Sequence, residues 1–272
     1  MFPLYQKELP ASGDDLAAAL EASLRRLVVA SGRIVSIVEN AYPDLAEIAI
    51  NLDGAQLQVN APRPSLAADN SATAISVDRL TLSGRQLSVG GASLDLDLNA
   101  QHIVLRQGRD KNGDVLLLLH RATDGQLALS IQQKDLEAMI GEIAKTEARK
   151  QGINIEDVRL TLTPHGSRSI GCEVQLHARK LFVRTTIRIA ARLEIDDHLV
   201  TRIFDLTCIG EGAIANLACS VLAPHLQKLS GRNFELMALP LGEVQLRNVR
   251  IEAAGTIKIS AEFGSANDRQ PG

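Results

Sequence analysis

The six histidines of this chain do not fall into the spacing of a metal site. None of them stands four residues from another histidine or a suitable acid on a predicted helix, as a metalloprotease requires. Asp196, Asp197 and His198 adjoin one another, but they lie between two predicted strands, where an exposed hairpin turn is the simpler interpretation. No spacing supplies further ligands, so the sequence predicts no metal site and no cofactor.

A second acidic segment resembles a calcium-binding loop only at its start. Asp110-Lys-Asn-Gly-Asp114 has the opening pattern, but Arg121 occupies the position where the closing acid should stand. Asn112-Gly113 instead predicts a hairpin turn, because such a turn needs positive φ.

Nucleophilic catalysis has little support. Cys219 lies on an apolar predicted helix, and His225 follows it only beyond Pro224, an arrangement that does not favour a reactive Cys–His pair. The chain has no nucleophile elbow, Walker loop or strand–GxGxxG–helix unit. We therefore predict that the protein is not an enzyme. Acids distant in sequence that meet in space would be the exception.

The basic residues form a more regular pattern. Lys180, Arg184, Arg188 and Arg192 recur every four residues, which on a strand places them on one face, about 13 Å apart. One interpretation is a solvated face with acidic partners on neighbouring strands. The other is a row that contacts lipid headgroups or a membrane surface.

Three amphipathic helices and many strands must position these residues. Helical periodicity occurs near 14–30, 133–149 and 211–229, and Ser12 precedes the first segment as an N-cap. In the second segment Leu136, Met139, Ile140 and Ile143 share a face.

Between the helices the hydrophobic period changes to two, which predicts antiparallel sheet with one dry and one wet face. In 181–195, Val183, Ile187 and Ile189 alternate with the arginines. Ala61–Thr73 is expected to be a long loop, and Asp124-Gly125 a turn. The other predicted strands are 46–51, 54–60, 74–82, 86–90, 92–98, 101–107, 114–120, 156–164, 170–179, 199–208 and 255–263.

The fold class predicted is α+β, with strongly twisted antiparallel sheets wrapping long amphipathic helices. The chain is expected to form one β-rich domain over 1–272, or two similar helix-plus-meander halves, about 12–130 and 131–263.

Composition limits the partners and the compartment. The chain of 272 residues is 45% hydrophobic and carries a net charge of -3, which gives no long-range attraction for nucleic acid. With no Trp, two Tyr and five Phe, the interior must be aliphatic. Cys172, Cys208 and Cys219 have no CxxC spacing, so we expect no disulfide framework and a reducing compartment. No signal peptide or transmembrane segment is evident, which predicts a cytoplasmic or peripherally membrane-associated protein.

The order of elements resembles a known family. The segments that carry the resemblance are Lys134-Asp-Leu-Glu-Ala-Met-Ile140, Val158-Arg-Leu-Thr-Leu162, the strand Leu181 to Ile195 followed by Asp196-Asp197, the strand Val200–Cys208, Leu239-Pro-Leu-Gly-Glu-Val-Gln-Leu246-Arg-Asn-Val249 and the upstream hairpin Leu80 to Leu96. Over residues 75–263 this order is similar to the bacterial LmeA-like phospholipid-binding family, which has a TULIP-like tubular lipid-binding fold. Members are often exported or lipid-anchored, whereas this chain shows no signal. The family offers no catalytic residues to carry over.

The resemblance implies non-enzymatic binding or transfer of phospholipid or acyl chains in an apolar tube. The predicted lining is the face of Val183, Ile187 and Ile189 against Leu217, Val221 and Leu222. Lys180, Arg184, Arg188 and Arg192 are the predicted headgroup contacts. A filled β core has the same aliphatic texture, so a structural or protein-interaction module, including a homo-oligomer, is the alternative.

Overall fold

The computed structural model describes residues 2–58, 66–150, 152–180, 182–196, 200–212, 215–216, 219–220, 227, 233–235 and 244–265. The chain divides into two compact units. Unit 1 comprises Met1–Leu129, Ala238–Asn248 and Ser260–Gly272, and unit 2 comprises Ser130–Met237 and Val249–Ile259.

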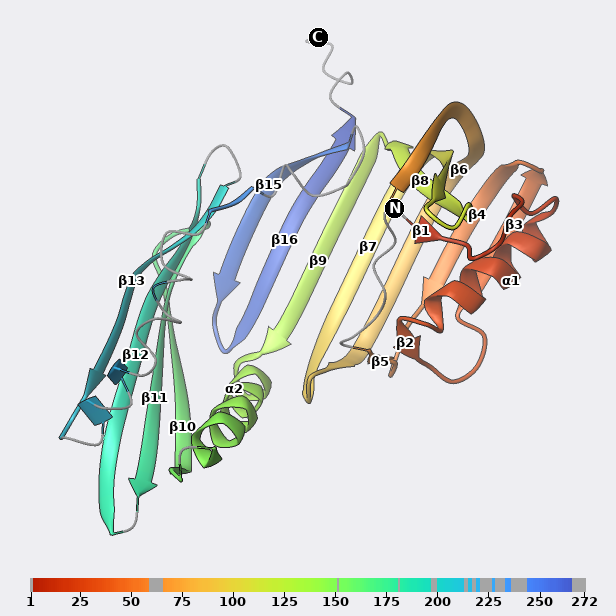
Figure 1. Ribbon diagram of the computed structural model, residues 1–272. Coiled ribbons are helices and arrows are strands. Elements are labelled where there is room, and N and C mark those ends of the chain that lie inside the picture. Colours follow the sequence, from red (N-terminus) through yellow and green to blue (C-terminus); the bar gives the residue numbers. More distant parts are fainter. Residues whose placement is uncertain are drawn as a thin grey trace. The chain divides into compact units, whose positions relative to one another are not determined.

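Two sheets and two helices make up the described part of the chain (Figure 1). The larger sheet has eleven strands in the order β15-β16-β9-β7-β6-β4-β3, with β1, β2, β5 and β8 paired off this path. Its strands are β1 (Phe2–Pro3), β2 (Val28–Val29), β3 (Val35–Ala41), β4 (Asp44–Asn51), β5 (Gln56–Leu57), β6 (Leu66–Val89), β7 (Ala92–Asp110), β8 (Val115–Arg121), β9 (Asp124–Gln132), β15 (Val244–Ala253) and β16 (Thr256–Ser265).

The smaller sheet is antiparallel and belongs to unit 2. Its five strands follow chain order: β10 (Asn154–Pro164), β11 (Ser169–Lys180), β12 (Val183–Ile195), β13 (Val200–Gly210) and β14 (Asn233–Glu235). The strands predicted at 156–164, 170–179, 181–195 and 199–208 are therefore confirmed to within a few residues.

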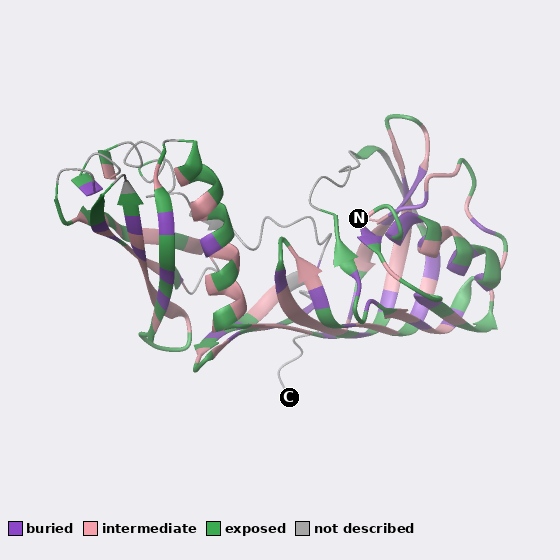
Figure 2. Ribbon diagram, turned by 90° about the horizontal axis from the view of Figure 1, so that it is seen from below, coloured by how far each residue is buried: buried purple, intermediate pink, exposed green. Residues whose placement is uncertain are grey.

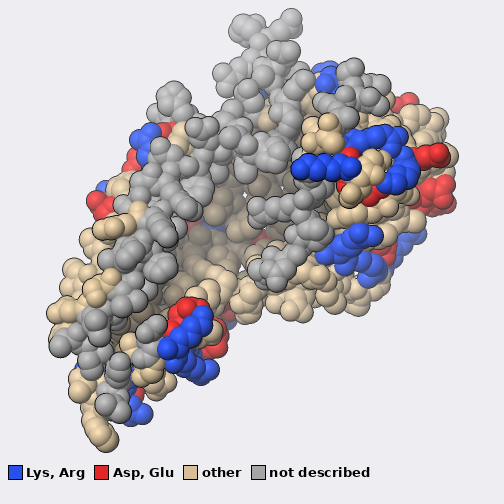
Figure 3. All heavy atoms as spheres, in the orientation of Figure 1, with Lys and Arg blue, Asp and Glu red and all other residues tan. Residues whose placement is uncertain are grey.

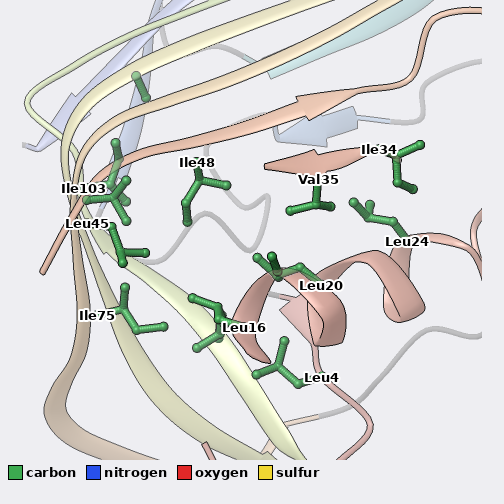
Figure 4. Packing of buried hydrophobic residues seen from close by; sticks show 14 of the residues in the cluster. Leu4, Leu16, Leu20, Leu24, Ile34, Val35, Leu45, Ile48, Ile75 and Ile103 are labelled. Atoms are coloured by element: carbon green, nitrogen blue, oxygen red, sulfur yellow. The ribbon is translucent and has the colours of Figure 1, made fainter. Parts of the chain in front are cut away.

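Helix α1 (Gly13–Leu24) covers the large sheet in unit 1. Ser12 is its N-cap, as predicted, and the Ser12 hydroxyl accepts a hydrogen bond from the Asp15 backbone N–H at 3.2 Å. Leu16, Leu20 and Leu24 recur on one face and point toward the strands (Figure 4). The resulting core contains 23 buried residues in the described part of unit 1, among them Val35, Leu45, Ile48, Ile75 and Ile103.

Helix α2 (Gln133–Arg149) matches the predicted helix 133–149. The third predicted helix, 211–229, lies largely outside the described residues, and its described members 215–216, 219–220 and 227 are helical. Neither α1 nor α2 is long and apolar enough to cross a membrane.

The prediction of purely antiparallel sheets was wrong for the large sheet. β4 runs parallel to β6, with Leu45 beside Val77 and Ile50 beside Leu82, and β5 also runs parallel to β6. Parallel neighbours need a crossover connection, and the period-two pattern that predicts a strand carries no information on the direction of its partner.

Several breaks predicted within the sheet do not occur, and the strands predicted at 92–98 and 101–107 form one strand, β7. The strands predicted at 74–82 and 86–90 form one strand, β6, which also includes residues 66–73 of the predicted loop. Gln86 interrupts the register as a bulge with φ 54°, and its N–H donates to the Asp95 carboxylate at 2.9 Å. Because this side chain replaces the lost ladder partner, the strand continues through the bulge.

Asp124-Gly125 is likewise not a turn but the start of β9. A Cβ on Gly125 would lie 2.1 Å from the Phe263 ring, so the glycine serves close packing rather than a turn. The turn predicted at Asn112-Gly113 is confirmed, since Gly113 has φ of 80° at the β7–β8 hairpin, and Gly91 has φ of 90° at the β6–β7 hairpin.

Candidate functional site

The five-stranded sheet of unit 2 has an apolar inner face. The buried residues of its described cluster are Ile155, Val158, Leu176, Ala178, Ile187 and Ala215. Ile140, Ala144 and Ala148 of α2 pack against this cluster while remaining only partly buried. The described part of the inner face is thus aliphatic.

The predicted lining residues fall in three different situations. Ile187 is 3% exposed within the cluster, and Ile189 packs against the cluster from the same strand. Val183 shares their side of β12, but it is 54% exposed because it stands at the start of the strand, next to the hairpin loop. Leu217, Val221 and Leu222 lie outside the described residues.

Helix α2 packs on the edge strand β10 through polar groups as well as apolar ones. The Gln133 side-chain amide donates to the Leu160 carbonyl, and the Leu160 N–H donates to the Glu137 carboxylate, each at 2.7 Å. These two bonds satisfy backbone groups at the edge of the sheet. They also fix which side of α2 faces the strands.

Of the predicted apolar face of α2, Ile140 packs against the sheet cluster, but the other three residues are not part of that cluster. Leu136, Met139 and Ile143, which we call the α2 stripe, lie roughly a third of a turn away from Glu137 and Ala144 at 3.6 residues per turn. Among the described residues the cluster includes Ile140 but no member of the α2 stripe. Ile143 is 59% exposed, and in all of α2 only Gly141 is buried (Figure 2). Ile143 therefore leaves apolar surface exposed on this helix, beside the partly buried Leu136 and Met139.

The outer face of the sheet carries the predicted basic row. Arg184 contacts Glu156 at 3.5 Å, and Arg188 contacts Glu173 at 3.3 Å. The Arg192 guanidinium lies over the Phe204 ring, 5.6 Å from its centroid. Each described arginine of the row thus has an acidic or aromatic neighbour on another strand of the sheet.

Lys180, the fourth member of the row, pairs with Val183 across the β11–β12 hairpin, and its side chain is outside the described set.

A polar pocket of about 450 Å³ adjoins this row on unit 2. His177 Nδ1 stands 3.4 Å from the Thr186 hydroxyl, and the Asp157 carboxylate accepts from Arg159 at 3.1 Å. Among its charged side chains, Asp157 forms an ion pair with Arg159, and Glu156 forms one with Arg184. Lining residues are Glu156, Asp157, Arg159, His177, Ala178, Arg184, Thr185, Thr186 and Glu211.

No group of three or more His, Cys, Asp or Glu side chains in the described part of the chain is arranged to hold a metal ion.

The cysteine prediction needs correction. Cys208 and Cys219 form a disulfide, with sulfur atoms 2.02 Å apart, that joins β13 to the segment that follows it. The pairing has an ordinary physical basis, because the two residues are only 11 apart in sequence and the chain turns back after β13. A stable disulfide is typical of an oxidising compartment, in contrast to the reducing one expected. Cys172 is free, and burial raises the pKa of its thiol.

Sequence reasoning missed the most exposed aromatic residue of unit 2. Phe182 is 98% exposed in the loop between β11 and β12. Period-two alternation placed it inside the strand 181–195, where it would be one more sheet residue. The missing signal was turn chemistry, because no Gly, Asn or Pro marks this loop.

Comparison with known proteins gives no relationship: no family model, no curated protein and no solved structure matches this chain.

Proposed function

We propose that this protein binds lipid without catalysing a reaction, and that acyl chains lie against the apolar surface of unit 2. The observation that carries the proposal is the α2 stripe, in which Ile143 is 59% exposed and Leu136 and Met139 are only partly buried, while polar bonds to Leu160 help to hold the helix in place. The exposed Ile143 is the part of this stripe that a ligand would contact first.

The composition of this surface suits a flexible hydrocarbon chain. Its residues are Leu, Ile, Val, Ala and Met, without aromatic platforms or a directional set of polar groups. Each CH₂ group moved from water to such a surface contributes about 0.8 kcal/mol. Phospholipid or fatty acyl chains fit these requirements better than a small polar substrate.

We propose in addition that unit 2 has a TULIP-like arrangement in which the curved sheet and helical segments enclose the acyl chain, as the resemblance to the LmeA-like phospholipid-binding family implies. Ile187 and Ile189 would line it, with Leu217, Val221 and Leu222 opposite. Binding followed by release at a membrane would amount to lipid transfer.

Titration with a fluorescent phospholipid tests the proposal on two variants matched in chemistry. Ile143→Glu places a charge on the α2 stripe, and Ile209→Glu makes the same change at an isoleucine of β13 that is 62% exposed and pairs with Arg188 of the outer face. We expect Ile143→Glu to weaken binding about tenfold or more, because a carboxylate is not accommodated beside hydrocarbon. Equal affinity of the two variants, or no saturable binding by the native protein, would contradict the proposal.

A protein-interaction module remains a second candidate because unit 1 has a filled core. Its 23 buried core residues include Leu16, Ile75 and Ile103, each less than 2% exposed. On this proposal the protein binds a second copy or another protein through its surface and needs no ligand. Size-exclusion chromatography with light scattering tests self-association, and a strict monomer at all concentrations would contradict the version in which the partner is a second copy.

A further inference from the structure

The hairpin between β11 and β12 ends in an exposed apolar tip, formed by Phe182 and Val183. Their exposed fractions are 98% and 54%. Lys180 pairs with Val183, so the hairpin loop has only two residues, of which Phe182 is described. Exposing a phenylalanine completely forgoes the burial that normally stabilises it.

Turn chemistry does not account for this choice of residue. The hairpins β6–β7, β7–β8 and β15–β16 place Gly91, Gly113 and Gly255 in their turns, with φ of 90°, 80° and 75°. Glycine is favoured there because short hairpin loops need positive φ. The β11–β12 loop carries bulky apolar residues instead, so its composition points to a contact outside the chain.

Two arginines stand directly behind the tip. Arg179 and Arg184 are opposite each other on β11 and β12, a placement that destabilises a sheet when the charges are alike. Glu156, at a bulge in β10, contacts both of them, at 3.4 Å and 3.5 Å. Two guanidinium groups share one carboxylate, which leaves surplus positive charge beside the tip. The Arg184 side chain is 77% exposed and the Arg179 side chain 48%.

Figure 3 shows the same arrangement at the end of this hairpin, where uncharged atoms project and basic atoms lie next to them. We infer that the tip docks on a membrane containing anionic phospholipid. Phe182 enters the boundary between headgroups and acyl chains, and Arg179 and Arg184 bind headgroup phosphates. This inference deepens the proposed lipid function by naming the surface with which unit 2 exchanges lipid.

The absence of tryptophan from the chain makes a direct experiment possible. Phe182→Trp supplies the only indole, and Ile209→Trp supplies a matched one on the outer face, away from the hairpin loop. With vesicles of phosphatidylcholine and phosphatidylglycerol, we expect the Phe182→Trp emission to shift to the blue and to be quenched by brominated acyl chains. The Ile209→Trp emission should not change. Unchanged emission of both variants, or equal shifts in both, would overturn the inference.

Vesicle flotation separates the apolar and the basic contributions. Phe182→Ser should reduce vesicle binding about tenfold or more at any salt concentration. Arg184→Gln should reduce binding about fivefold on anionic vesicles and should have little effect on phosphatidylcholine alone or at high salt. Binding that depends on neither substitution would show that another surface is responsible and would overturn the inference.

The two proposals fail separately. Phe182→Ser should still bind a monomeric fluorescent fatty acid, and Ile143→Glu should still float with anionic vesicles. If the native protein binds fatty acid but not vesicles, only the proposed membrane contact of the hairpin is contradicted. If it binds vesicles but no acyl chain, the proposed lipid-binding function is contradicted and the membrane contact of the hairpin stands.

Discussion

Single residues in this protein differ sharply in how much room their neighbours leave. A Cβ added to Gly125 would lie 2.1 Å from the Phe263 ring, within unit 1. A Cβ added to Gly141 of α2 would meet only Val158, at an ordinary 3.6 Å. The same chemical change should therefore have opposite effects at the two positions.

Gly125→Ala is expected to lower the free energy of unfolding by about 1–3 kcal/mol, because the ring must move to admit the methyl group. Gly141→Ala should be neutral or stabilising by up to about 1 kcal/mol, since alanine favours a helix. Urea denaturation measures both. A Gly125→Ala variant as stable as the native protein would show that Phe263 does not pack against this glycine.

The three cysteines give a second prediction at this scale. Unfolded, unreduced protein should react with a thiol reagent at Cys172 only, and reduction should expose all three thiols. In the native state Cys172 should react slowly at neutral pH, because burial raises its thiol pKa and so lowers the thiolate fraction. Three thiols before reduction would contradict the Cys208–Cys219 bond.

Hydrophobic alternation predicts which face of a strand a side chain lies on, and this limits which residues could be placed from the sequence. Alternation along β12 correctly separates the inward Ile187 from the outward Arg184 and Arg188. It says nothing about the ends of a strand, where Val183 is exposed and Phe182 leaves the sheet. Cys208 and Cys219 approach through a chain reversal, which residue types alone do not reveal.

At the scale of elements, side chains that replace missing backbone partners decide where strands and helices continue or end. The Asp95 carboxylate accepts a hydrogen bond from the Gln86 N–H, so β6 continues past the bulge. The Gln133 and Glu137 side chains form hydrogen bonds to the backbone of β10 and hold α2 against it. At the end of α1, the Arg25 guanidinium donates to the Ala30 carbonyl at 2.8 Å and to the Glu21 carboxylate at 2.7 Å. Glu21 thereby orients the side chain that links the helix to the turn after it.

The Glu21 contact predicts a dependence of stability on pH. The hydrogen bond from Arg25 lowers the pKa of Glu21 below its ordinary value of 4.5. Its contribution is fully present above that ordinary value and disappears as the pH falls through the lower, folded-state pKa. Glu21→Gln should lower the free energy of unfolding at neutral pH by about 0.5 kcal/mol, the scale of a partly exposed pair.

Unfolding in urea at neutral and acidic pH checks this expectation. The difference between Glu21→Gln and the native protein should narrow as the pH drops below 4.5. Glu142→Gln is the control, because the Glu142 side chain, which pairs with Lys145 on α2, is 72% exposed and solvent screens the pair. A difference for Glu21→Gln that grows in acid would contradict the assigned sign.

The elements themselves were predicted where local signals are strong. Ser12 fixes the start of α1, and residues 133–149 carry the whole of α2. β9 was missed because Asp124-Gly125 has the composition of a turn, although the Phe263 ring is what requires the glycine. The rotation of α2 that leaves Ile143 exposed depends on two bonds to Leu160, a contact 23 to 27 residues away in sequence.

At the scale of the molecule, the described residues of each unit form an apolar cluster of their own. In unit 1 this cluster has 23 buried side chains, and in unit 2 it has six. Sequence predicted the aliphatic composition of both clusters but not which residues join each one, because composition does not record contacts. The parallel pairing of β4 with β6 and the return of residues 238–248 to unit 1 also depend on contacts between distant segments.

The apolar surface of unit 2 is the basis of the central claim, that the protein binds lipid through this unit. In the described residues it includes the exposed Ile143 and the partly buried Leu136, Met139 and Ile189. A lipid bound there during synthesis should remain with the protein through gentle purification.

Native mass spectrometry of the purified protein, combined with analysis of its solvent extract, tests the claim most directly. We predict a population heavier than the chain by the mass of a phospholipid or fatty acid, the same lipid in the extract, and its loss from Ile143→Glu but not from Ile209→Glu. Repeated recovery of the bare chain alone, together with failure to take up added lipid, would contradict the account.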